Sequence, residues 1–204
     1  MSIEVPRLYP IADASFGDPV ELAISLFSGG ARLVQIRNKF ARAREFHDQV
    51  ESVIRLAPEG ARVIVNDRVD VALLTNALGV HLGQSDLPCS VARAILGPNA
   101  ILGLSTHDEE QARIADQDSS DYIAVGPIFP TASKTDAEQV IGLDRLSAIC
   151  DVVEKPVVAI GGISLTNVSD VISAGARSVA VISDLVGHAD VERRTREFLS
   201  KLEV

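Results

Sequence analysis

Eight short apolar segments rich in Val, Ile and Leu recur along the 204 residues, one in every stretch of about 25 residues. Segments of this length and composition are typical of buried β-strands. Longer segments with apolar residues at helical spacing lie between them. Because regular alternation of strands and helices is typical of α/β proteins with a parallel sheet, this repeat limits the chain to very few folds.

The apolar pattern and the turn residues between segments place the expected elements. The expected strands cover residues 8–12, 33–37, 62–65, 79–82, 101–104, 122–125, 157–160 and 178–182. The expected helices cover residues 19–27, 41–56, 69–76, 109–116, 144–151, 166–173 and 190–202, and the weakest pattern, at 90–96, spans barely two turns.

Eight β/α units in a chain of this length predict a closed parallel (β/α)8 barrel, the TIM barrel, with residues 1–204 as a single domain. The alternative is a doubly wound open sheet. No G-x-G-x-x-G follows the first strand, however, where a dinucleotide-binding fold would carry it. The longest irregular segment is 126–142, and a loop of that length in a compact domain indicates a lid or a binding loop.

The charge and the cysteine content exclude several classes of partner. With 19 basic and 28 acidic residues the net charge is −9, which argues against a nucleic-acid partner and against an anionic membrane surface. Cys89 and Cys150 form no C-x-x-C motif, so neither a disulfide framework nor a zinc site is indicated. No signal-peptide pattern and no apolar run near the roughly 20 residues of a membrane span are present, so we expect a cytoplasmic protein.

The segment 34–39 carries the most informative polar pattern. If it is a strand, Gln35, Arg37 and Lys39 share one face, while Val34 and Ile36 share the other. The polar face is expected to point into the protein, where unpaired charge is costly and is usually matched by a ligand. An anionic ligand is therefore expected. The alternative is an edge strand whose charged face lies in solvent.

Polar residues also follow the next four predicted strands, at the end where the active sites of such barrels lie. They are Asn66, Asp67 and Arg68, then Gly83 to Asp86, then Ser105, Thr106 and His107, and finally Thr131, Ser133 and Lys134. Asp67 and Asp86 are candidate Mg²⁺ ligands, because two carboxylates on adjacent strand ends suit a cation that completes its shell with water and phosphate oxygens. The alternative makes Asp67 a helix cap paired with Arg68, and Asp86 part of a turn.

A second anion site is predicted after the last two strands. Gly161 and Gly162 follow the seventh strand, and Val181, Ile182 and Ser183 end the eighth, where barrels commonly bind phosphate. The alternative is a tight turn that needs glycine for a positive φ. His81 is expected to be a buried, hydrogen-bonded residue rather than a base. No Ser/His/Asp or Cys/His set can be assembled, so nucleophilic catalysis is not favoured.

Several motifs occur together and in order along the chain, at residues 30–39, 65–70, 79–88, 103–107, 121–131, 159–163 and 179–183. This ordered set covers most of the chain and closely resembles thiamine phosphate synthases. The resemblance implies a TIM barrel that joins a hydroxymethylpyrimidine diphosphate to a thiazole phosphate, with Mg²⁺ as the cofactor. The products would be thiamine phosphate and pyrophosphate.

The resemblance also implies a role for each matching residue. The pyrimidine would contact Gln35, and its diphosphate would be bound by Arg37, Lys39, Asn66 and Lys134. Ser105 would line the pocket of the pyrimidine diphosphate. Of these, Arg37, Lys39, Ser105 and Lys134 would take part in catalysis. Asp67 and Asp86 would hold Mg²⁺, and the thiazole phosphate would contact Thr131, Ser133, Gly162, Ile182 and Ser183.

Three positions depart from the family pattern. Ala12 replaces the usual Thr of the first strand, Asn38 replaces the usual Glu between Arg37 and Lys39, and Ser133 replaces Thr but keeps the hydroxyl. Asn38 is expected to face away from the ligand. The departures therefore bear on catalytic efficiency more than on the class of reaction.

Two other functions stay open at this level. A thiazole tautomerase of the same fold would need no diphosphate site, and the complete set of cations and carboxylates argues against it. A catalytically silent barrel that only binds phosphate ligands would share the fold, so turnover separates it from an enzyme. The expected partners are small molecules, and a homodimer is a further expectation on which the sequence carries no direct signal.

Overall fold

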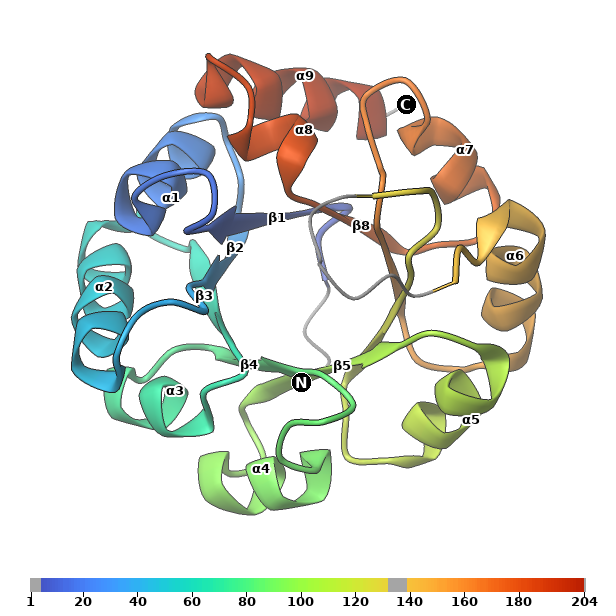
Figure 1. The fold of residues 1–204 in the computed structure, drawn as a ribbon, viewed down its shortest axis with the longest axis horizontal. Coiled ribbons are helices and arrows are strands. Elements are labelled where there is room, and N and C mark those ends of the chain that lie inside the picture. The colour runs from blue at the N-terminus through green and yellow to red at the C-terminus, as the bar shows by residue number, and fades with distance from the viewer. Residues whose placement is uncertain (1–4, 132–138, 204) are drawn as a thin grey trace.

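The computed structural model describes residues 5–131 and 139–203. Its strands are parallel and close into a barrel in which each strand pairs with the next along the chain and β8 pairs with β1 (Figure 1). The strands are β1 (Leu8–Asp13), β2 (Leu33–Arg37), β3 (Arg62–Asn66), β4 (Gly79–Leu82), β5 (Ile101–Thr106), β6 (Tyr122–Val125), β7 (Val157–Ile160) and β8 (Ser178–Val181). The predicted TIM barrel is confirmed, and the doubly wound sheet is excluded.

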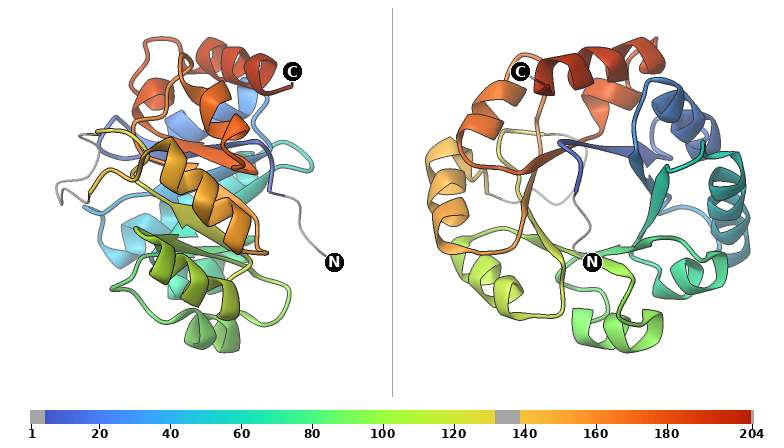
Figure 2. Two further views of the ribbon diagram at one scale, coloured as in Figure 1. Left: turned by 90° about the vertical axis from the view of Figure 1, so that its right-hand side faces the viewer. Right: turned by 180° about the vertical axis from the view of Figure 1, so that it is seen from behind.

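The helices form a ring outside the barrel, as both end-on views show (Figures 1 and 2). They are α1 (Pro19–Ser28), α2 (Ala43–Leu56), α3 (Val69–Thr75), α4 (Cys89–Leu96), α5 (Glu109–Gln117), α6 (Gly142–Val152), α7 (Val168–Ser173), α8 (Ser183–Val186) and α9 (Val191–Leu202). Their apolar stripes explain the ring. On α2, for example, Phe46, Val50 and Val53 recur at helical spacing and are buried. Within the described ranges, none of these helices has the length and apolar character that a membrane crossing requires.

Alternation along the strands divides the core into two apolar layers. Val34 and Ile36 on β2 belong to the layer between the barrel and the helices, and both are fully buried. Tyr9, Ile64 and Val158, on three other strands, belong to a separate cluster that fills the barrel interior. This inner layer forms the floor beneath the polar residues at the carboxyl ends of the strands.

Most predicted elements differ from the observed ones by one or two residues at one end or both, and two of these differences have a clear local explanation. The helix predicted from residue 41 begins at Ala43, because Asn38 Oδ1 accepts hydrogen bonds from the N–H groups of Phe40 and Ala41 and holds them in a turn. The strand predicted over 178–182 ends at Val181, and the short helix α8 that follows was not predicted. A single helical turn directly after a strand has too few residues to show a helical period.

Residues 126–131, which follow β6, lie at the carboxyl ends of the strands beside the connection that follows β7 (Figure 1). They are fixed to that connection, because Ile128 N–H donates to Ile160 O at 2.9 Å and Phe129 N–H donates to Gly161 O at 3.0 Å. Of the lid predicted over residues 126–142, residues 132–138 lie outside the described residues, and the lid stays a prediction.

Candidate active site

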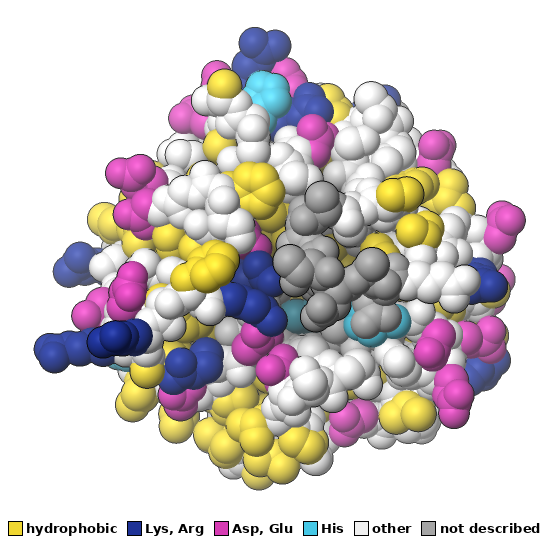
Figure 3. Space-filling model, in the orientation of Figure 1, with side chains coloured by type: hydrophobic (Ala, Val, Ile, Leu, Met, Phe, Trp, Pro, Cys, Tyr) yellow, Lys and Arg dark blue, Asp and Glu magenta, His cyan; other side chains and the backbone are white. Residues whose placement is uncertain are grey.

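A cavity of about 650 Å³ opens at the carboxyl ends of the strands. Residues from all eight strands line it. On this face of the molecule, Lys and Arg side chains meet Asp and Glu side chains beside the centre (Figure 3). The cavity brings together seven of the residues predicted for the pyrimidine diphosphate and Mg²⁺, which are Gln35, Arg37, Lys39, Asn66, Asp67, Asp86 and Ser105.

The polar face of β2 points into this cavity. β2 lies between β1 and β3 in the closed barrel, so it has no free edge. Gln35 is 2% exposed, the Arg37 side chain is 12% exposed, and Lys39, just beyond the strand, is half exposed at the rim. The edge-strand alternative is therefore excluded. Asn38 faces away, as predicted, because its side chain bonds to the turn before α2 and donates to Gln49 Oε1.

Arg37 forms an ion pair with Asp13, the last residue of β1. Asp13 is 2% exposed, and its Oδ1 accepts hydrogen bonds from the backbone N–H and the hydroxyl of Ser15, at 2.9 and 2.7 Å. A buried carboxylate that is bonded through both oxygens fixes the position of its guanidinium partner. Asp13 therefore holds Arg37 in the wall and matches its charge before any ligand binds.

Asp67 and Asp86 follow β3 and β4. Lys39 Nζ lies 3.3 Å from Asp67 Oδ2. Burial and, next, repulsion from the Asp86 carboxylate raise the pKa of Asp67, and Lys39 opposes this rise. Asp67 also has φ 61°, in the left-handed region that is uncommon for residues other than glycine.

The alternative roles of these two carboxylates are only partly correct. Asp67 neither caps α3 nor pairs with Arg68, because Arg68 itself occupies the cap position and its guanidinium pairs with Asp70. Asp86 does lie in a turn, in which its Oδ2 accepts the N–H of Gly83 at 2.7 Å. The turn aims the Asp86 carboxylate toward Asp67 and is compatible with a ligand role.

The charge around the cavity bears on which cofactor it could hold. In the described chain, Arg37 and Lys39 face three carboxylates, those of Asp13, Asp67 and Asp86. Within those residues, no three His, Cys, Asp or Glu side chains converge as a metal-binding group. Two close carboxylates fit Mg²⁺, which keeps several waters and takes further oxygens from a phosphate substrate. The pKa of Asp67, raised partly by Asp86, is the sign of repulsion that such a cation would relieve.

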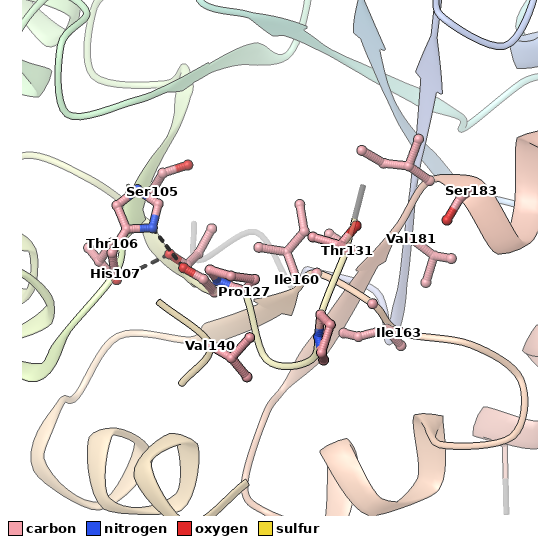
Figure 4. A pocket seen from close by; sticks show the side chains of 17 residues that line it. Ser105, Thr106, His107, Pro127, Thr131, Val140, Ile160, Ile163, Val181 and Ser183 are labelled. Carbon is pink, nitrogen blue, oxygen red and sulfur yellow. Dashed lines mark hydrogen bonds between the residues drawn. The ribbon is translucent and has the colours of Figure 1, made fainter. Parts of the chain in front are cut away.

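A second cavity of about 240 Å³ adjoins the first (Figure 4). The two cavities share a wall made of Ser105, His107, Ala124, Ile160, Ala180 and Ile182. Figure 4 shows Ser105 and Ser183 on opposite sides of the second cavity. Four residues predicted for the thiazole phosphate line it, namely Thr131, Gly162, Ile182 and Ser183. Two further predicted site residues follow Thr131 in the sequence, namely Ser133 and Lys134. Both lie outside the described residues, and their roles stay predictions.

Both the backbone conformation and the close packing after β7 require glycine at positions 161 and 162. Gly161 and Gly162 have φ 98° and 64°, as the tight-turn alternative expected. A Cβ on Gly162 would also lie 2.6 Å from Pro130 O, and one on Gly161 would lie 2.6 Å from Pro127. Asn167 Nδ2 donates to Gly162 O at 3.0 Å and ties the turn to the start of α7. The turn is thus packed under the segment that follows β6.

The histidines differ in their surroundings. His81 is buried, and its two ring nitrogens contact Tyr122 Oη and Ser105 Oγ, so the prediction of a hydrogen-bonded core histidine is confirmed. His107 lines both cavities, and its Nδ1–H donates to Gly126 O at 2.7 Å. That bond leaves Nε2 of His107 as the acceptor nitrogen.

Sequence reasoning missed Asp13, Tyr9 and Tyr122. Asp13 lies one residue past the predicted end of the first strand, and its partner Arg37 lies on the next strand. The two tyrosines are the only ones in the chain, and both fall on inward positions of predicted strands. Period-two alternation, applied to every strand as it was to 34–39, would have found the tyrosines.

The fold and this site define a (β/α)8-barrel enzyme whose polar cleft lies at the carboxyl ends of its strands. Residues 8–185 match the family model described as thiamine monophosphate synthase. The thiamine-phosphate synthase of Koribacter versatilis is 45% identical over 98% of this chain and 97% of its own length, and that of Moorella thermoacetica is 46% identical over 89% of each. The thiamine phosphate pyrophosphorylase structure from Pyrococcus furiosus superposes with a TM-score of 0.90 and 39% identity, covering 97% of this chain and 95% of that one. The chain belongs to the thiamine monophosphate synthase family.

Proposed function

We propose that this protein condenses hydroxymethylpyrimidine diphosphate with thiazole phosphate to give thiamine phosphate and pyrophosphate. The observation that carries the proposal is the pair of adjoining cavities with one shared wall. One cavity has cations and carboxylates at its rim, and the other has the glycine turn and Ser183. Family membership and the names of the relatives support the same reaction.

The reaction breaks the bond between the pyrimidine methylene carbon and the diphosphate oxygen, and the thiazole nitrogen forms the new bond to that carbon. Negative charge grows on the departing diphosphate, so the residues that matter most are those that stabilise it. We assign Arg37, Lys39 and Asn66 to the diphosphate, because all three line the first cavity on neighbouring strands. Lys134 is proposed to join them. No base on the protein is needed, because the attacking nitrogen carries a lone pair and no proton.

Mg²⁺ is the proposed cofactor, with Asp67 and Asp86 as its ligands. When bound, it would neutralise charge on the diphosphate oxygens. The chain's own contribution is to hold the two carboxylates together: the left-handed backbone of Asp67 and the Gly83 turn of Asp86 fix their positions. Because carboxylates outnumber cations around this cavity in the described chain, we expect diphosphate binding to depend strongly on the metal.

The thiazole phosphate is assigned to the second cavity. Its phosphate would meet the backbone of Gly162 and the hydroxyls of Ser183 and Thr131, and its ring would lie against the shared wall. A shared wall places the two reacting rings side by side, which converts an encounter in solution into a positioned one. Departure of the diphosphate would leave positive charge on the pyrimidine methylene carbon. The apolar members of the shared wall limit the access of water to that carbon, and they are Ala124, Ile160, Ala180 and Ile182.

The test is turnover. The protein is incubated with both substrates and Mg²⁺, and thiamine phosphate and pyrophosphate are measured, with each component omitted in turn. Equal amounts of both products, only in the complete mixture, support the proposal. Isomerisation of the thiazole phosphate alone, without formation of thiamine phosphate in the complete mixture, would indicate a tautomerase-type activity. Binding of either ligand without turnover would indicate a silent barrel. Either result would refute the synthase function.

Two properties stay predictions from the sequence. We propose a cytoplasmic location on the basis of the cysteine content, to be tested by fractionation of cells that express the protein. A homodimer is also proposed, and light scattering on the purified protein measures its mass directly.

A further inference from the structure

A chain of hydrogen bonds crosses the floor of the first cavity from one wall to the other. Gln35 Nε2 lies 3.1 Å from Tyr9 Oη, which lies 2.8 Å from Tyr122 Oη. Tyr122 Oη lies 3.0 Å from His81 Nδ1, and His81 Nε2 lies 2.8 Å from Ser105 Oγ. All five side chains are buried. Gln35 at one end is predicted to contact the pyrimidine, and Ser105 at the other end is predicted to line the pyrimidine diphosphate pocket. The three middle residues have no role in the proposal above.

The amide of Gln35 sets the direction of this chain. Gln35 Nε2 can only donate, so Tyr9 Oη accepts that bond. The one other side-chain partner that the described residues give Tyr9 Oη is Tyr122 Oη, so we infer that Tyr9 donates its proton there. Tyr122 then donates to His81 Nδ1, which leaves the imidazole proton on Nε2 as the donor to Ser105 Oγ. Because Ser105 Oγ accepts from His81, its own hydroxyl proton is turned toward the cavity that it lines. Gln35 keeps its carbonyl oxygen for a ligand.

Packing holds the middle of the chain in place. The Tyr122 ring stacks on His81 with centroids 5.7 Å apart and meets the edge of Tyr9 at 5.8 Å. A Cβ on Gly103 would lie 2.0 Å from the Tyr122 ring, so the ring occupies space that only glycine leaves open. Burial raises the pKa of Tyr9 to about 12, which keeps its hydroxyl protonated and able to donate. In the described chain, no buried side-chain nitrogen or oxygen lacks a partner.

We propose that Tyr9, Tyr122 and His81 are positioning residues that fix the hydrogen-bond polarity of the pyrimidine pocket. Through them, Gln35 presents an acceptor on one wall and Ser105 presents a donor on the other. The ligand that fits is a neutral heteroaromatic ring with a donor on one edge and an acceptor on another, as in an aminopyrimidine. The identity of this ligand rests on the proposed function. The positions of the donor and the acceptor in the pocket follow from the chain of hydrogen bonds and do not depend on the identity of the ligand.

Tyr122→Phe tests the inference, because it removes the central oxygen and keeps the ring. In the ligand-free protein, ¹⁵N NMR should show His81 with its proton on Nε2, and Tyr122→Phe should give a mixture of the two tautomers. The His81 signals are assigned by their absence in His81→Gln. Affinity for the pyrimidine diphosphate should fall roughly three- to tenfold, the effect of one hydrogen bond, while the KM for thiazole phosphate stays unchanged.

Ser178→Ala is the matched control. Ser178 is a fully buried hydroxyl on β8, two residues before Ala180, and it donates to Pro6 O at 2.6 Å away from both cavities. Like Tyr122→Phe, the Ser178→Ala variant loses one buried hydroxyl, so it shows how far that loss alone lowers ligand affinity. The His81 tautomer and the pyrimidine diphosphate affinity should match those of the unaltered protein.

A second measurement tests whether Gln35 and Ser105 are energetically coupled through the chain of hydrogen bonds. The losses in affinity caused by Gln35→Ala and Ser105→Ala should be non-additive in the unaltered protein and additive in the Tyr122→Phe background. If Tyr122→Phe does not fold, Tyr9→Phe cuts the neighbouring link and receives the same measurements. Additive losses in both backgrounds, or a His81 tautomer unaffected by either tyrosine variant, would overturn the inference. Failure of the proposed function appears separately, as absence of thiamine phosphate with the unaltered protein.

Discussion

Asp13 and Arg37 face each other in the register between β1 and β2 and form the most buried ion pair of the described residues. The pair lies at the edge of the cavity that we assign to the diphosphate, although Asp13 would make no contact with that ligand. We propose that the pair holds a cation at the place where the diphosphate would bind. We therefore expect the stability of the folded protein and its affinity for the diphosphate to depend on the same ion pair.

Asp13→Asn is expected to lower the free energy of unfolding by about 2 kcal/mol, because it leaves the Arg37 charge buried without a counter-ion. Added inorganic pyrophosphate with Mg²⁺ should stabilise the variant more than it stabilises the unaltered protein, since the ligand supplies the missing negative charge. Denaturant unfolding with and without the ligand measures both effects. Asp70→Asn removes the exposed pair between Asp70 and Arg68 and should cost less than about 0.5 kcal/mol. Equal losses in the two variants would contradict the prediction.

Asp67→Asn separates stability from metal binding. Without Mg²⁺ the variant should melt at or above the temperature of the unaltered protein, because it removes repulsion from Asp86 and asparagine tolerates a left-handed φ. The stabilisation that Mg²⁺ adds should disappear. Asp144→Asn, which alters an exposed carboxylate in the first turn of α6, should keep the full response to Mg²⁺. Thermal melts across a Mg²⁺ titration decide the matter, and a normal response in Asp67→Asn would remove that residue from the metal site.

The raised pKa of Asp67 predicts how Mg²⁺ affinity depends on pH. Only the ionised carboxylate binds the metal, so affinity should fall as the pH drops through this raised pKa. In the metal-free protein the sign is the opposite: the contribution of Asp67 to stability is fully present below the ordinary aspartate pKa and is lost as the pH rises through the raised value. Lys39→Met should move the midpoint to higher pH, because Lys39 lowers this pKa. Calorimetric titration with Mg²⁺ at several pH values gives the midpoint, and a shift to lower pH would be the contrary result.

Gly162→Ala should destabilise the protein and weaken thiazole phosphate binding together. It adds a side chain at φ 64° and places a Cβ 2.6 Å from Pro130 O, so we expect a cost of about 3 kcal/mol and at least a tenfold loss of affinity. Gly60→Ala isolates the backbone term, because Gly60 has φ 80° and nothing lies within 4 Å of its Cβ position. That control should cost about 1 kcal/mol and leave binding intact. Similar costs for the two variants would mean that packing under the segment after β6 contributes nothing.

The fold was predictable because every strand, and every helix except the single turn of α8, shows its apolar pattern within its own residues. The inward direction of Gln35 and Arg37 followed from period-two alternation once the barrel was assumed. The pairing of Arg37 with Asp13 did not, because it depends on the register between two strands that are 24 residues apart. The same holds for Tyr9 and Tyr122, which meet only across the closed barrel. The alternation within a strand therefore predicts which side chains point into the barrel. Which of these side chains contact one another depends on strand register and on closure of the barrel.

The hydrogen-bond chain draws on β2, β1, β6, β4 and β5, and its two tyrosines are 113 residues apart in the sequence. Neither the N-terminal nor the C-terminal half of the polypeptide contains all the residues of this hydrogen-bond chain. Because Ile160 of β7 and Ala180 of β8 also line the cavity, we expect the pocket to form during synthesis only after β8 has been made and the barrel has closed. A nascent or truncated protein could not capture the pyrimidine, so substrate capture would itself report that folding is complete.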